Sequence, residues 1–219
     1  MNSTIEKIAA AVREYHGGAE SGHGWWHVDR VRHTAMAIQR DEARGNPLVV
    51  EVAALVHDIG DYKVKGMDDD TGAVEKILKE SELPGEVIRE TLYIHENISF
   101  RKSLEGAVAR TPELDIVQDA DRLDAIGAIG IARAFSYGGS KGNEIYIPGE
   151  KPVNIDSGEA YRNSQSCVIN HFYEKLLTLK DKMNTSTGAR IAAGRHRFME
   201  LFLEQFFKEM GKGTSDDNK

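Results

Sequence analysis

The stretch Leu48–Gly60, LVVEVAALVHDIG, decides how the rest of the sequence is interpreted. It is nearly all apolar, and a helix that is hydrophobic on every face is normally buried. We therefore expect it to be the central core helix, with Gly60 as its C-terminal cap. Its end carries His57 and Asp58, which are costly to bury unless something pairs them. A divalent metal would satisfy both, although a hydrogen-bonded or capping pair is the more common explanation of a His-Asp dyad alone.

Helical periodicity continues on both sides of this stretch. Ser3 and Glu6 form a capping-box pair, and the helix that they open should end at Gly17 and Gly18. The remaining apolar repeats and turn residues predict helices over residues 27–43, 71–80, 85–96, 113–135, 158–183 and 187–210.

Two polar segments interrupt the predicted helices. Residues 61–70 are expected to be a loop, and residues 136–157 a loop or flap-like insertion with a strand at 144–147. The tail 211–219 is expected to be disordered. The fold class that follows is all-α, a helical bundle.

The composition is that of an ordinary globular protein: 219 residues, 40% apolar and 29% charged. Asp and Glu outnumber Lys and Arg by 35 to 28, which gives a formal net charge of -7. This balance argues against a nucleic-acid polymer as partner, because such binding needs a basic face. It is compatible with a small phosphorylated substrate held by a few local cations.

The sequence also carries no sign of a membrane or an oxidising compartment. Cys167 is the single cysteine, so no disulfide can form within the chain. The first residues lack the basic start and apolar core of a signal peptide, and no apolar run approaches the ~20 residues needed to cross a bilayer. We expect a cytoplasmic protein.

The segment 23–31, HGWWHVDRV, supplies a further metal-ligand candidate. His27 lies inside the apolar-periodic helix, whereas His23 precedes it. Arg30 follows His27 by one turn, close enough to meet a phosphate oxygen bound to a metal. Trp25 and Trp26 are expected to pack on the core.

The segment 118–124, QDADRLD, places three carboxylates in an otherwise apolar helix. Asp121 and Asp124 share a face at i, i+3 spacing, and Asp119 points elsewhere. A solvated charged face is the usual explanation of such a run, but the flanking apolar residues argue against it. The small residues that follow suggest close packing against another helix.

A third group, His171, Glu174 and Lys175, also shares one helix face. A surface ion pair explains it at least as well as a substrate contact.

Taken together, these residues resemble a known family. His27, the pair His57-Asp58 and Asp121 form the H…HD…D pattern of HD-domain phosphohydrolases. The blocks HGWWHVDRV, AALVHDIGDYK, VQDADRLDAIGAIGIARAF and NHFYEKLL are similar to a bacterial and fungal subgroup of small HD hydrolases, some of which look like nucleoside triphosphate pyrophosphohydrolases. The likeness runs from about residue 20 to 206.

The resemblance implies an all-α HD fold and a divalent metal bound by four ligands: His27, His57, Asp58 and Asp121. Asp121 is preferred over Asp119 because related enzymes share the pattern Ala-Asp-Arg-Leu. The resemblance further implies a single domain over residues 1–210, with an HD core at about 20–135 and the helices of 158–210 completing it.

The sequence departs from the family pattern at two positions. The family often has His-Asp where this chain has His23-Gly24, and His95 stands where relatives often carry an aliphatic residue. His95 has no evident partner for a second metal, so a mononuclear site is preferred.

A ligand set of two His and two Asp suits Mn, Fe, Co, Ni or Zn better than Ca, and Mg is not excluded. The metal would activate water and polarise the phosphoryl group. Asp58, or Asp124 from further away, would orient or deprotonate that water. The cations expected around the phosphates are Arg30, Lys63, Arg122 and Lys175.

The main prediction is a nucleotide phosphohydrolase, specifically a pyrophosphohydrolase of nucleoside triphosphates. The alternatives are a phosphomonoesterase of 5'-nucleotides, a non-catalytic metal- or nucleotide-binding sensor, and a purely structural bundle. A homodimer is compatible with the apolar faces of the last two helices.

Overall fold

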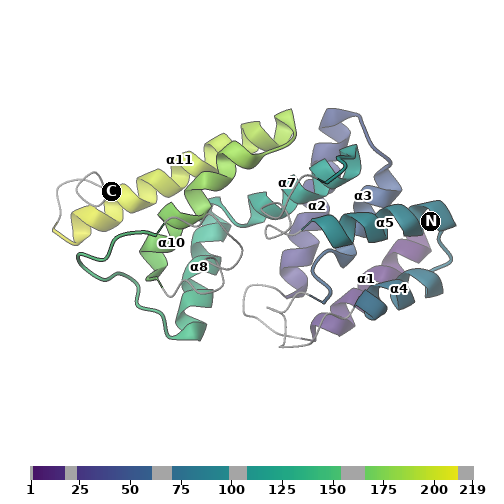
Figure 1. Ribbon diagram of the computed structural model, residues 1–219, viewed down its shortest axis with the longest axis horizontal. Coiled ribbons are helices and arrows are strands. Elements are labelled where there is room, and N and C mark those ends of the chain that lie inside the picture. Colours follow the sequence, from purple (N-terminus) through teal and green to yellow (C-terminus); the bar gives the residue numbers. More distant parts are fainter. Residues whose placement is uncertain (1, 18–23, 61–70, 99–107, 154–165, 212–219) are drawn as a thin grey trace. The chain divides into compact units, whose positions relative to one another are not determined.

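The computed structural model describes residues 2–17, 24–60, 71–98, 108–153 and 166–211 (Figure 1). These residues form helices and no strand, so the predicted all-α class is confirmed. No helix within the described ranges is long and apolar enough to cross a membrane. The chain divides into two compact units, Met1–Asp121 and Arg122–Lys219. The assignment of a single domain over 1–210 stays a prediction.

The first unit consists of six helices within the described residues: α1 (Asn2–His16), α2 (Trp25–Glu42), α3 (Pro47–Val56), α4 (Thr71–Glu80), α5 (Gly85–Asn97) and α7 (Pro112–Asp124), whose last three residues belong to the second unit. Most of these bounds agree with the predicted ones to within two residues. The predicted loop at 61–70 lies outside the described residues.

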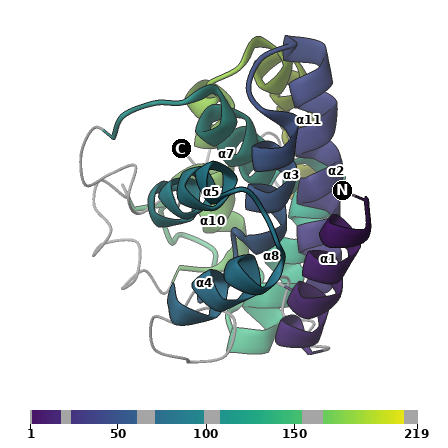
Figure 2. The same cartoon turned by 90° about the vertical axis from the view of Figure 1, so that its right-hand side faces the viewer.

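The apolar stretch forms the central helix of this unit, as predicted. The side chain of Asn46 caps α3 by accepting a hydrogen bond from the Leu48 N–H at 3.0 Å, and Pro47 occupies the first turn. α3 packs against α1, α2 and α5 (Figure 2), and its apolar residues from Val49 onward are buried. It ends at Val56, earlier than predicted, so that His57–Gly60 form a turn.

The second unit contains α8 (Gly127–Lys141), α10 (Val168–Glu174), the 3-10 helix η2 (Leu176–Lys182) and α11 (Ser186–Glu209). α11 packs against α8 and η2, and α8 also contacts α10. Three aromatic rings meet in this core, with centroids 5.7 to 6.2 Å apart: Phe135, Phe172 and Phe202. Thr185 caps α11 by accepting from the Gly188 N–H at 2.9 Å.

The prediction of one helix over 113–135 is wrong, because the chain breaks between α7 and α8. Ile126 is extended and Gly127 has φ +76°, a conformation that L side chains rarely adopt. Arg195 of α11 donates to the Leu123 carbonyl, and Arg133 donates to the Asp124 carbonyl at 3.2 Å. The Leu123 carbonyl also accepts from the Ile126 N–H at 3.2 Å, so the two guanidinium groups add further hydrogen bonds to the carbonyls at the end of α7.

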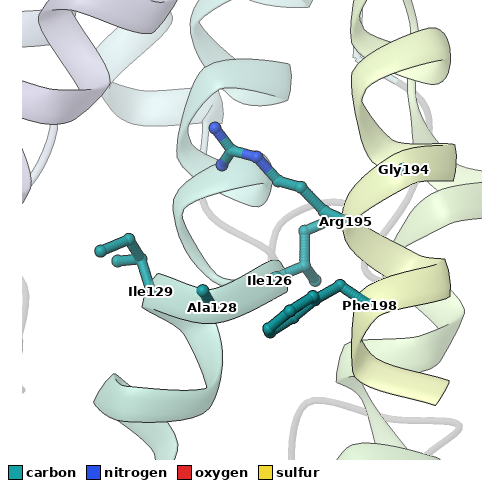
Figure 3. A pocket seen from close by; sticks show the side chains of 7 residues that line it. Ile126, Ala128, Ile129, Gly194, Arg195 and Phe198 are labelled. Carbon is teal, nitrogen blue, oxygen red and sulfur yellow. The ribbon is translucent and has the colours of Figure 1, made fainter. Parts of the chain in front are cut away.

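Figure 3 shows the hollow next to this break. Residues at the start of α8 and in the middle of α11 line the hollow. The side chain of Arg195 extends past Ile126 on one side, and Phe198 lies on the other side. A Cβ added to Gly127 would lie 2.9 Å from Cγ of Arg195. The glycine is therefore required both by its backbone conformation and by the close approach of Arg195.

The predicted strand at 144–147 is also wrong. The carbonyls of Glu144 and Ile145 accept hydrogen bonds from the N–H groups of Val168 and Ile169, at 2.9 and 3.0 Å. These N–H groups belong to the first turn of α10 and have no partner within that helix. The segment therefore serves as a backbone cap for α10 instead of pairing with another strand. Because α8 extends to Lys141, the insertion begins later than the predicted residue 136.

The prediction of one helix over 158–183 is wrong as well. α10 ends at Glu174, and η2 follows after Lys175, whose φ of -138° and ψ of -57° are not helical. Residues 158–165 lie outside the described ranges, as do 212–219 of the predicted disordered tail. The predicted helix over 187–210 is confirmed as α11, Ser186–Glu209.

Replacing Gly127 with Ala should destabilise the protein by about 1–3 kcal/mol. The new Cβ would be strained at positive φ and would displace Arg195. Gly139→Ala in the same helix is the matched control, because no atom lies within 4 Å of its Cβ position, and we expect no loss of stability there. Urea unfolding measures both variants, and equal transition midpoints would contradict the explanation of the helix break.

Candidate metal centre

His27 enters the site from the first turn of α2. Gly24 is extended and precedes the helix, and the His27 N–H donates to the Gly24 carbonyl at 2.9 Å. The His27 side chain is buried, with 2% of the residue exposed. Of the two preceding tryptophans, Trp25 packs against the core as predicted. Trp26 is exposed, so its predicted core role is wrong.

His57 and Asp58 lie in the turn that follows α3, and both are buried. Nδ1 of His57 is 2.8 Å from the Ala54 carbonyl. A carbonyl can only accept, so Nδ1 carries the hydrogen and Nε2 keeps its lone pair. This is the tautomer that a histidine needs to bind a metal through Nε2.

Two side chains from other helices hold the same turn. Nε2 of His95, on α5, donates to the Ile59 carbonyl at 2.8 Å. The N–H of Gly60 donates to the hydroxyl of Tyr15, on α1, at 3.2 Å. Gly60 has φ +79°, which lets the chain leave the turn. Neither role was predicted from the sequence: Tyr15 belongs to no motif there, and His95 was a candidate only for a second metal.

Asp121 of α7 completes the group. Nε2 of His27 lies 3.2 Å from Nε2 of His57, and Oδ1 of Asp121 lies 3.4 Å from the first and 3.8 Å from the second. Oδ2 of Asp58 is 3.7 Å from Nε2 of His27. Four side chains from α2, the turn after α3 and α7 therefore meet within the first unit.

These distances fit one divalent ion. Two ligand atoms, each about 2.1 Å from an ion and at right angles around it, lie about 3.0 Å apart, and opposite ligands lie about 4.2 Å apart. The four separations fall at or between these values. His27, His57 and Asp121 form the group that can hold a metal through one atom each, with all three atoms within 4.8 Å of one another. Asp58 as the fourth ligand stays a prediction.

The charge state of Asp121 also suits a metal ligand. Partial burial by itself raises the pKa of this carboxyl, but a hydrogen bond with His27 and the electrostatic influence of the two imidazoles outweigh it. The net effect places the pKa of Asp121 well below its ordinary value. The carboxylate form, which is the form that binds metals, is therefore favoured across the physiological range.

The predicted cations occupy several places. Arg30 is half-buried on α2, and Lys63 lies outside the described residues. Arg122 and Lys175 belong to the second unit, where Arg122 donates to the Lys182 carbonyl. Burial, and then the positive charges of Arg122 and Lys175, lower the pKa of Lys182. Lys182 is thus a neighbour of both predicted cations, which the sequence pattern did not reveal.

The other predicted acidic residues have structural partners. Asp124 is buried in the second unit, and its carboxylate accepts from Arg133 at 2.7 Å. Glu174, which shares a face with His171 and Lys175, is also buried. It accepts from the Val153 N–H at 3.0 Å and from the Ser166 hydroxyl at 2.6 Å. Glu174 therefore anchors the insertion to α10 and is not a surface ion-pair residue.

Comparison with known proteins agrees with this geometry. Residues 25–126 match the HD domain family, a range that includes all four candidate ligands. The Bacillus subtilis protein YpgQ is 38% identical over 211 residues, covering 94% of this chain and 93% of YpgQ. A crystal structure of YpgQ in complex with ADP has a TM-score of 0.75 to this structure, at 33% identity, and covers 94% of this chain and 97% of its own.

Two further solved structures are similar over nearly their whole length. A protein from Lactobacillus plantarum has a TM-score of 0.83 at 35% identity and covers 96% of this chain and 98% of its own. An HD-superfamily hydrolase from Bacillus thuringiensis has a TM-score of 0.73 at 39% identity, with the same coverage of 96% and 98%. The likeness therefore includes both compact units.

His27→Ala should abolish tight binding of one divalent metal, because it removes a buried ligand from the centre of the group. Metal content after dialysis and a Co²⁺ absorption spectrum measure the loss. His33→Ala is the matched control, since His33 lies on the same helix with its side chain 74% exposed. Equal metal content in both variants would show that the group around His27 does not hold the ion.

His95→Leu should weaken metal affinity by about 10-fold, the effect expected when a contact that positions a ligand is lost. His95→Gln should recover part of the affinity, because its side-chain amide can still donate to the Ile59 carbonyl. Competition with a chelating dye measures both variants. Equal affinity in His95→Leu and the wild type would contradict the positioning of the turn by His95.

Proposed function

The chain belongs to the HD-domain superfamily of metal-dependent phosphohydrolases, and we propose that its substrate is a nucleotide, with pyrophosphate released from nucleoside triphosphates. The observation that carries the proposal is the meeting of His27, His57 and Asp121 around a volume that fits one divalent ion. The ADP bound in the structure of YpgQ supports a nucleotide as the ligand class.

We assign His27, His57, Asp58 and Asp121 as the ligands of one ion, with Mn, Co, Ni, Fe, Mg and Zn as the candidates. Such an ion supplies Lewis acidity that activates water and polarises a phosphoryl oxygen.

Asp58 and Asp124 are the two candidates for the base that orients the attacking water, and they differ in their surroundings. Asp58 lies within the metal group, with Oδ2 3.7 Å from Nε2 of His27. The carboxylate of Asp124 is instead engaged in an ion pair with Arg133, with Nη1 of Arg133 2.7 Å from Oδ2 of Asp124. These contacts favour Asp58 over Asp124 for the proton transfer.

Arg30 lies one turn after the proposed ligand His27 on α2. The guanidinium group has five N–H donors and is suited to phosphate oxygens. Arg122, Lys175 and Lys63 are proposed as further phosphate-binding residues. Arg122 donates to the Lys182 carbonyl, and Arg122 and Lys175 lower the pKa of Lys182 beyond the larger effect of burial, so three cations lie near one another in the second unit, as phosphate sites require.

The test is the release of pyrophosphate and of orthophosphate from a panel of nucleotides. Metal-free protein is supplemented separately with Mn²⁺, Co²⁺, Ni²⁺ and Mg²⁺, beside the Asp58→Asn variant. We expect pyrophosphate from triphosphates and a loss of at least about 100-fold in kcat for Asp58→Asn. Glu75→Gln is the control, since Glu75 is an exposed residue paired with Lys79.

Other outcomes would redirect the assignment. Orthophosphate from monophosphates would identify a 5'-nucleotide phosphomonoesterase. Metal binding without turnover of any nucleotide would identify a sensor, and circular dichroism of Asp58→Asn separates loss of chemistry from loss of fold.

A further inference from the structure

Trp26 is an exposed aromatic residue immediately next to a metal ligand, and the core does not account for it. The residue is 61% exposed, whereas Trp25 packs against the apolar cluster of the first unit. Tryptophan is highly buried on average, because its ring is large and mostly apolar. An indole left in water on the first turn of α2 therefore requires another explanation.

Helical spacing aligns Trp26 with the residues of the proposed site. Trp26 and Arg30 are separated by four positions and share one face of α2, and Arg30 is three positions from His27. Side chains on a helix lean toward its N-terminus, so Arg30 leans toward the turn that carries Trp26. The first two turns of α2 thus bear a metal ligand, a cation and an indole next to one another.

Arg13, on α1, places its guanidinium group against the exposed ring of Trp26. Its guanidinium carbon lies 5.9 Å from the centroid of the Trp26 ring and 5.8 Å from that of Trp25. Both distances are within the range of a cation–π interaction. The contact orders the indole before any ligand arrives, which lowers the entropy cost of binding to it.

We propose that Trp26, braced by Arg13, stacks on the nucleobase of the substrate. The proposal rests on the proposed function for its substrate class. It implies that the site prefers nucleotides to phosphate compounds that lack a base, such as inorganic tripolyphosphate. Since every nucleobase has a π-face, stacking on one ring also implies a broad tolerance for the identity of the base.

The decisive comparison uses ATP and inorganic tripolyphosphate with the Mn²⁺-loaded enzyme, because both carry a triphosphate chain and only ATP carries a base. Trp26→Ala should lower the ratio of kcat/KM for ATP to that for tripolyphosphate about 10-fold, the size expected for one base–aromatic stack. Trp26→Phe keeps an aromatic face and should retain most of the ratio.

Phe198→Ala is the matched control, because it removes an aromatic side chain that is 50% exposed on α11 (Figure 3). Its ratio should equal that of the wild type. An unchanged ratio in Trp26→Ala, or an equal fall in Phe198→Ala, would overturn the stacking assignment.

A binding measurement separates this inference from the proposed function. The chain has two tryptophans, so indole fluorescence reports on Trp25 and Trp26 together. With Mg²⁺ and α,β-methylene ATP, which resists cleavage between the α- and β-phosphates, we expect quenching in the wild type that is lost in Trp26→Phe. Absence of quenching in the wild type, or equal quenching in the variant, would overturn the stack. A wild type that quenches but hydrolyses no nucleotide would overturn the proposed activity and leave the stack supported.

Discussion

The hydrogen bond from Nδ1 of His57 to the Ala54 carbonyl, 2.8 Å long, is the contact on which the candidate metal centre depends. Ala54 lies in the last turn of α3, where the carbonyls have no amide partner within the helix. One bond therefore satisfies a buried carbonyl and fixes the tautomer whose Nε2 faces His27 and Asp121. His57 itself keeps helical dihedrals, φ -57° and ψ -30°, so its side chain leaves the end of α3 in the direction that the helix sets.

The sequence predicted the features that depend on local patterns. Apolar spacing and capping residues placed the bounds of α1, α2, α5 and α11 within two residues, and the H…HD…D pattern predicted the group around His27. It missed the break before Gly127, because this break is stabilised by Arg195, 68 positions away. It also missed Tyr15 and His95 as supports of the metal-binding turn. Both bond to backbone groups, and such bonds leave no pattern of paired side chains in the sequence.

Asp121 and Asp124 show how far helical spacing can be trusted. Their i, i+3 separation predicted a shared face of one helix, which α7 provides. Spacing fixes a direction but not a partner: Asp121 meets two imidazoles, and Asp124 meets the guanidinium of Arg133. Imidazoles can yield their lone pairs to a metal, whereas a guanidinium offers none. Two equivalent carboxylates in the sequence thus acquire different chemistry from their partners.

The distribution of charge bears on how an acidic protein could take a polyanionic substrate. The chain has a formal net charge of -7, so its overall field repels phosphates. Binding must then come from cations gathered at short range, where screening by water and salt is weakest. Lys182, whose pKa is lowered by burial and by Arg122 and Lys175, lies beside two of the cations proposed for this role. Under the proposed function, these neighbouring cations are the groups that would meet the phosphates at short range.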